Sequence, residues 1–284
     1  MKFIIGLVIV VISVIGGYLM AHGSLGVLFQ PAELVIIGGS AFGAFIITNP
    51  GKVLKGVLAG MPQIIAGSKY NKQAYMEVLA LMYELFTKAR KEGLMSLEAH
   101  VDEPDNSDLF NKYPSVLKDH GALEFITDYL RLIVGGNMNA MELENLMDAE
   151  LDNHHHTADA PGTALVTVGD ALPGFGIVAA VLGVIITMGS IGGSPAELGM
   201  HVAAALVGTF LGILLAYGFV GPMGNALKSV AEDEGKFLTC IKMCILATLN
   251  GYSPQVAVEF GRKVIDHSDR PNFLELEEYI KQPR

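Results

Sequence analysis

Long parts of this chain lack lysine and arginine altogether. Leu172–Gly193 and Leu198–Val220 contain neither residue, and a short Gly/Ser/Pro link separates these two apolar runs. Each run is about 22 residues long, which at 1.5 Å per residue suffices to cross a hydrocarbon core of roughly 30 Å. The pattern predicts a transmembrane hairpin, with Pro173 at the start of its first run and Pro222 just past its second.

Cysteine is scarce, and the motifs of common enzymes are missing. Cys240 and Cys244 are the only cysteines, and their spacing of four favours packing thiols over a redox or zinc site. No GxxxxGK[ST] or GxSxG motif and no convergent polar cluster occurs, so we expect no catalytic residue, metal or cofactor. The net charge of −10, without a basic stripe, also argues against a nucleic-acid partner.

Two further apolar runs stand near the N-terminus. Residues 3–21 form the first, which we interpret as a retained span because no clean small-x-small cleavage site follows. Leu34–Thr48 forms the second, which needs flanking residues such as Ala32 and Glu33 to cross a bilayer. The sequence therefore predicts four spans with a short loop, His22–Glu33, between the first two.

The basic residues set the expected orientation. All 19 Lys and Arg residues lie at position 2, between 52 and 131, or from 228 onward. Because lysine and arginine are retained on the cytoplasmic side, both termini and the 50–168 segment are expected inside, with the short links outside. This predicts a multi-pass membrane protein, in contact with membrane lipid, with its N- and C-termini in the cytoplasm.

The segment between the span pairs is expected to fold into helices. Apolar residues at three- and four-residue spacing predict helices over 73–91, 122–134 and 140–151. His154, His155 and His156 follow in a polar stretch that ends near Pro161, which we interpret as a solvated connector rather than a metal site.

After Pro222, helices are predicted over 224–249, 254–266 and 271–281. The fold class is thus an all-α membrane protein with four transmembrane helices and a helical cytoplasmic domain. The expected domains are 1–49 (first two spans), 50–168 (cytoplasmic), 169–222 (last two spans) and 223–284 (cytoplasmic helices).

Charge is missing from the middle of every predicted span. Glu33, Asp170, Glu197 and His201 all stand near predicted span ends. If the chain carries ions, another subunit is expected to supply the carboxylate, because transport through lipid needs a titratable group at depth.

The polar candidates in the last two spans are hydroxyls: Thr187, Ser190 and, near mid-span, Thr209. The simpler interpretation of Thr209 is a hydrogen bond to its own helix's i−4 carbonyl. The glycines and alanines that crowd these two runs would let helices approach closely, within the chain, between copies or against a partner.

Two more features have competing interpretations. Pro173 either starts a helix or forms a hinge that couples the span to the cytoplasmic domain, and the spacing does not decide between them. The charges from Lys88 to Glu98, Arg90 among them, are on composition alone a solvated face.

Several long segments together resemble the flagellar stator subunits of the MotA/TolQ/ExbB proton-channel family. They are GGYLMAHGSLGVLFQPAELVIIGGSAFG at 16–43, GDALPGFGIVAAVLGV at 169–184, ELGMHVAAALVGTFLGILLAYGF at 197–219 and LNGYSPQVAVEFGRK at 249–263. The resemblance runs over almost the whole chain and is weakest at 95–120 and 148–165. TolQ/ExbB-like siblings, which energise envelope transport, are the alternative; the fourth span and the PAEL and LNGYSP segments favour the stator branch.

The resemblance implies a location in the bacterial inner (cytoplasmic) membrane, a mechanism and a set of functional residues. Chains of this kind would form a ring, expected to be pentameric, around a MotB-like single-span partner whose membrane aspartate takes up the ion. Ion passage would move the ring, and the cytoplasmic domain would push on the rotor protein FliG. By matching motif, Arg90 and Glu98 are the expected rotor contacts, Pro173 and Pro222 the coupling prolines, and Thr209 the hydroxyl of the ion path.

The resemblance also bears on the ion. Sodium-driven relatives carry further threonines along the path, whereas this chain has Ala180 and Phe210 at the corresponding positions. Neither side chain offers an oxygen to a hard cation. Protons are therefore expected, with a sodium-driven stator as the alternative; from the residues alone, a passive membrane scaffold also stays open.

Overall fold

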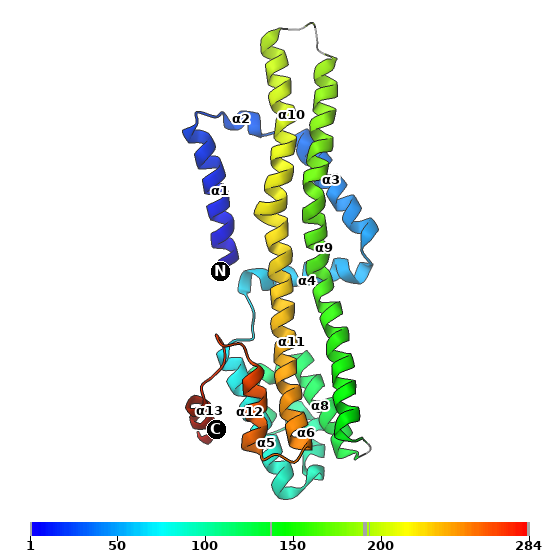
Figure 1. The fold of residues 1–284 in the computed structure, drawn as a ribbon, viewed down its shortest axis with the longest axis vertical. Helices are drawn as coiled ribbons and strands as arrows, with labels where there is room; N and C mark the ends of the chain where they lie inside the picture. Colours follow the sequence, from blue (N-terminus) through cyan, green and yellow to red (C-terminus); the bar gives the residue numbers. More distant parts are fainter. Residues whose placement is uncertain (1, 137, 190–191, 193, 283–284) are drawn as a thin grey trace. The chain divides into compact units, whose positions relative to one another are not determined.

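The computed structural model describes residues 2–136, 138–189, 192 and 194–282, and every regular element among them is helical (Figure 1). The chain folds as two compact units, Met1–Gly67 with Thr157–Val230, and Ser68–His156 with Ala231–Arg284. The predicted division at residues 49, 168 and 222 concerns the two sides of the membrane, and it stays a prediction.

The first unit contains the N-terminal helices, part of α9 (Ala140–Met188), all of α10 (Pro195–Leu215) and the first part of α11 (Gly221–Leu249); the rest of α9 and α11 belongs to the second unit. Four helical segments are long and apolar enough to cross a membrane: Lys2–Met20, Leu25–Thr48, Ala140–Met188 and Pro195–Leu249. The other elements of this unit are α1 (Lys2–Met20), α2 (Leu25–Leu28), α3 (Pro31–Thr48), α4 (Gly51–Ala66) and the π-helical turn η4 (Ala216–Val220). The all-α fold with four candidate spans is confirmed, although α2 and the first turn of α3 occupy part of the predicted 22–33 loop.

Small residues hold α9 against α10 at very short range. A methyl group added at Gly176 would lie 2.8 Å from the carbonyl oxygen of Gly208, and one added at Gly183 would lie 2.7 Å from Cβ of Ala205. Only glycine permits such an approach of two helix backbones. The small residues predicted to pack on a neighbouring helix therefore face each other within this chain.

The helix α4 is amphipathic and packs in the same unit. Its apolar residues Val53, Val57 and Ile64 are buried, whereas Leu58 is exposed. A methyl group added at Gly56 would lie 2.8 Å from Cγ of Pro161, and one added at Gly60 would lie 2.5 Å from Cδ2 of Leu227, so neither position has room for it.

The second unit is a helical bundle with its own apolar core. Its further elements are α5 (Lys72–Glu92), η1 (Leu94–Leu97), α6 (Glu98–Asp102), η2 (Pro104–Asn106), η3 (Phe110–Lys112), α7 (Pro114–Leu117), α8 (His120–Val134), α12 (Pro254–Val264) and α13 (Phe273–Lys281). In the core, the rings of Tyr70 and Tyr75 lie 4.7 and 5.2 Å from that of Phe237. Cys240 and Cys244 are free and fully buried, as expected for packing thiols.

The predicted polar connector at 153–161 is wrong. The helix predicted over 140–151 does not end there but continues to Met188 as the 49-residue α9 (Figure 1). Packing explains the continuity. In the second unit His154 faces Glu234, and in the first unit Asp159 lies 3.5 Å from Lys228. These contacts from α11 hold a segment whose composition alone favours a loop.

Candidate functional site

The two predicted ion-path residues lie on facing helices. Thr209 of α10 has its Cα 3.4 Å from the position that a Gly176 Cβ would take, and Ala180 of α9 has its backbone nitrogen 3.2 Å from the corresponding position at Gly208. Both residues are half-buried. The structure thus brings Thr209 and Ala180 to one seam between α9 and α10.

The hydroxyls of the last two spans differ in their bonding. Thr187 donates a hydrogen bond of 2.8 Å to the carbonyl of Gly183, four residues earlier in its own helix. Among the residues that the structure describes, the Thr209 hydroxyl makes no such bond, so the simpler interpretation of this residue is wrong. Ser190 lies outside the described residues. Thr209 therefore keeps its hydroxyl available to water or to a partner.

A carboxylate that the sequence placed at a span end reaches this seam. Glu33, in the first turn of α3, is only 8% exposed, and its Oε2 lies 2.6 Å from the position of a Gly208 Cβ. The same position is 3.1 Å from Cβ of Ala179. The glutamate is visible in the PAEL segment of the sequence, but that segment does not show which part of α10 the start of α3 packs against.

Both coupling prolines lie inside continuous helices. Pro173 is an interior residue of α9, so its interpretation as a helix-start proline is wrong. Pro222 is the second residue of α11, which begins directly after the last residue of η4. The helix therefore continues through Pro222, whereas the sequence predicts that it ends before this residue. A proline inside a helix removes one backbone hydrogen bond and weakens the helix locally. Each long helix therefore has a weak turn at the predicted coupling position, and α9 has another at Pro161.

The predicted rotor contacts are both on the surface of the second unit. Arg90 stands in the last turn of α5 and Glu98 at the start of α6, and both side chains are exposed. Between them Gly93, at φ 89°, ends α5 and turns the chain into η1. Neither charge pairs with another residue in the described part of the chain, whereas the adjacent Lys88 pairs with Glu92 at 3.1 Å.

The histidine tract contributes one partly buried titratable group. His154 Nε2 lies 3.7 Å from Oε1 of Glu234, while His155 and His156 are exposed. The contact with Glu234 raises the pKa of His154 against the opposing effect of burial, and it lowers the pKa of Glu234. The predicted solvated tract is thus wrong for His154 and right for its two neighbours.

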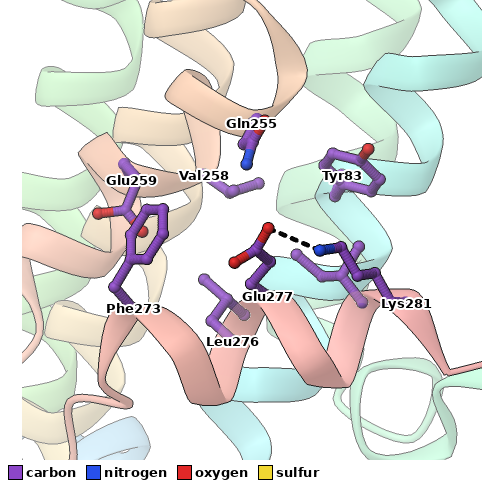
Figure 2. A pocket seen from close by; sticks show the side chains of 9 residues that line it. Tyr83, Gln255, Val258, Glu259, Phe273, Leu276, Glu277 and Lys281 are labelled. Atoms are coloured by element: carbon purple, nitrogen blue, oxygen red, sulfur yellow. Dashed lines mark hydrogen bonds and ion pairs between the residues drawn. The ribbon is translucent and has the colours of Figure 1, made fainter.

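The second unit contains a cavity of about 150 Å³ between α5, α12 and α13, and Figure 2 shows the side chains that line it. In it Lys281 reaches Glu277 at 2.7 Å, and an apolar wall that includes Leu276 and Phe273 lies beside this pair. None of the predicted site residues lines the cavity. The ion-path candidates and this cavity are therefore separate features of the chain.

Comparison with known proteins gives consistent matches over the whole chain. Residues 4–93 match the family described as Motility protein A N-terminal, and residues 119–238 match the MotA/TolQ/ExbB proton channel family. Motility protein A of Salmonella typhimurium is 49% identical over 284 residues, covering 100% of this chain and 96% of the relative. Motility protein A of Escherichia coli is 50% identical over 281 residues, covering 99% and 95%.

Solved structures agree with these sequence matches. The flagellar MotAB stator complex from Bacillus subtilis matches with a TM-score of 0.72 and 26% identity, over 90% of this chain and 92% of that chain. The C. jejuni MotAB structure has a TM-score of 0.79 at 21% identity, over 94% and 96%, and shares the fold. The chain belongs to the motility protein A family of flagellar stator subunits within the MotA/TolQ/ExbB proton channel family.

Proposed function

We propose that this stator subunit conducts protons together with a single-span partner and converts their passage into torque on the flagellar rotor. The solved relatives named above are MotAB complexes, which supports a MotB-like partner for this chain. The seam between α9 and α10 offers a hydroxyl at Thr209 but carries no buried carboxylate of its own on these two helices. In this proposal the partner's membrane aspartate binds the proton, and five copies of the chain surround the partner in the lipid bilayer.

The choice of proton over sodium rests on the chemistry of the seam. A sodium ion needs several oxygen ligands, and near Thr209 the side chains of Ala180 and Phe210 provide none. A proton needs only a chain of hydrogen-bonding groups. The single observation that carries the proposal is therefore the hydroxyl of Thr209, which makes no backbone hydrogen bond within the described residues and lies among the glycines and alanines where α9 and α10 meet.

The direction of force transfer follows from the proposed topology. With both termini and the 50–168 segment in the cytoplasm, Arg90 and Glu98 face the rotor, and the unpaired charges contact FliG. The weak turns at Pro173 and Pro222 are the points where ion passage bends or rotates the helices.

Swimming speed tests the ion. Cells that carry this chain and its partner as the only stator are tracked in buffers with and without sodium, and with and without a protonophore. We expect speed to be independent of sodium and to fall to zero with the protonophore. Speed that rises with sodium and survives the protonophore would assign the sodium-driven alternative instead.

A further inference from the structure

Glu33 is a buried carboxylate without a partner. Its side chain is 8% exposed, and Oε2 is fully buried with no hydrogen bond. No capping box joins its carboxylate to the backbone N–H of Gln30, the N-cap residue of α3. In the part of the chain that the structure describes, no cation pairs with it.

The position of Glu33 is deep along α10, although it is early in α3. Its neighbour Gly208 comes thirteen residues after Pro195, the first residue of α10. At 1.5 Å per residue this is about 20 Å along the helix from its outer end. A residue at the end of one span thus lies beside the middle of another.

The surroundings of Glu33 leave space for its carboxylate but provide no charged partner for it. A Cβ on residue 208 would lie 2.6 Å from Oε2 of Glu33, so the glycine leaves the space that the carboxylate uses. The other groups at this point are Cβ of Ala179 and the backbone of Ala180. Ile37, Leu172 and Ala216 belong to an apolar cluster of the same unit, and no ion pair joins Glu33 to a charged side chain in the described part of α9 or α10.

A carboxylate in such a place costs free energy and does not serve packing. Burial of an unpaired polar group is unfavourable, and ionisable residues within membrane segments generally mark ion pathways. A structural role would be met better by glutamine or by an apolar residue. Thr209, the predicted hydroxyl of the ion path, directly follows Gly208 in α10.

We propose that Glu33 is a proton-relay residue on the outer half of the ion path. This inference rests on the proposed function as a proton-conducting stator. The carboxylate takes a proton from a hydronium ion on the outer side, which leaves water and the neutral acid. The acid then gives the proton to a carboxylate on the partner's membrane helix and returns to its charged form.

The test measures proton flux through the complete complex with its partner, reconstituted in vesicles that contain a pH-sensitive dye. Glu33→Gln keeps the size and polarity of the side chain but cannot exchange a proton. Glu33→Asp keeps the carboxylate on a shorter stem. Glu197→Gln is the matched control, because Glu197 is an exposed residue in the first turn of α10 whose capping-box role glutamine also fills.

We expect Glu33→Gln to lower the flux at least tenfold, Glu33→Asp to restore a substantial part of it, and Glu197→Gln to leave it unchanged. We also expect the outer pH of half-maximal flux to differ between wild type and Glu33→Asp. Co-purification of the partner and an unchanged or higher melting temperature establish that Glu33→Gln assembles, since it removes only an unpaired charge.

The outcomes separate this inference from the function on which it rests. If Glu33→Gln assembles and conducts like wild type, the relay is wrong and proton conduction stands. If Glu33→Asp is as inactive as Glu33→Gln, with no change in pH profile, the side chain has a positional role and the relay is again wrong. If the wild-type complex itself carries no protons, the proposed function fails.

Discussion

Gly212 offers the most direct test of how tightly the two membrane helices are joined. A methyl group at this position would lie 2.8 Å from the carbonyl oxygen of Leu172 and 2.9 Å from Cα of Gly176. Both obstacles are backbone atoms of α9, so no side chain can rotate away to admit the methyl group. Gly212→Ala must therefore push α9 and α10 apart.

The size of the effect follows from these distances. Carbon atoms in contact prefer separations of about 3.5–4.0 Å, so the helices must separate by roughly half an ångström or more. Overpacking of this kind costs about 1–3 kcal/mol, which for a protein of this size lowers the melting temperature by roughly 2–12 °C relative to a Gly→Ala change in the same helix that meets no neighbour. Since Thr209 and Ala180 lie on the same seam, we expect swimming speed to fall as well.

The assay compares Gly212→Ala with Gly199→Ala in the purified complex and in cells. Gly199 lies in the same helix, but a methyl group there has no neighbour within 4 Å. This control should melt at or above the wild-type temperature, because alanine is the better helix former by about 1 kcal/mol. Equal melting temperatures and equal swimming speeds for Gly212→Ala and Gly199→Ala would refute the close packing of α9 on α10.

Two further predictions concern the second unit. Because the contact with Glu234 raises the pKa of His154, its stabilising effect is complete below the ordinary value of about 6.5 and is lost as pH rises through the raised value. The melting-temperature difference between wild type and His154→Ala should thus shrink from pH 6 to pH 8.5; a difference that grows with pH would contradict the pairing. For the rotor contacts, an exposed pair contributes only about 0.2–1 kcal/mol, so a single charge acts weakly and an array around a ring acts strongly. Arg90→Glu combined with Glu98→Lys should abolish soft-agar spreading with normal flagellar number, alanine at both positions should impair it less, and normal spreading of the double reversal would remove the contact assignment.

The helices of the second unit could be predicted because their boundaries are set locally. The side chain of Asn71 accepts hydrogen bonds from the backbone N–H groups of Gln73 and Ala74, which starts α5. Gly93, at φ 89°, ends it, and residues of this kind mark helix ends in sequence. The predicted helix over 73–91 accordingly differs from Lys72–Glu92 by one residue at each end.

The continuity of α9 could not be predicted, because distant residues decide it. The polar tract at 153–161 has the composition of a connector, and a proline such as Pro161 usually interrupts a helix. The partners that keep it helical, such as Lys228 at 3.5 Å from Asp159, come from a helix about seventy residues later.

The position of Glu33 beside the middle of α10 could not be predicted either, because a residue distant in the sequence sets it. Its distance from the nearest helix end is visible in sequence, but its neighbour Gly208 is far along the chain, and only the packing of α3 on α10 brings the two together. For this reason the search for charge within the spans missed the residue on which the proton relay depends. The roles of Thr209, Ala180 and the two prolines stay predictions until the flux and swimming experiments are made.

The wide turn η4 has a geometric consequence for the whole helix pair. Gly212, Ala216 and Gly224 all lie on the side of α9, with a Gly224 methyl position only 2.8 Å from the carbonyl of Gly162. In an unbroken α-helix at about 100° per residue, Gly224 would point roughly 120° away from Gly212. The extra residue per turn in the π-helix takes up most of that angle. η4 is thus a phase correction that keeps one seam of small residues aligned on both sides of it. Deleting one residue there would leave an ordinary α-helix in which Gly212 and Gly224 still share a face, whereas the same number of residues wound as α-helix would turn Gly224 away from α9.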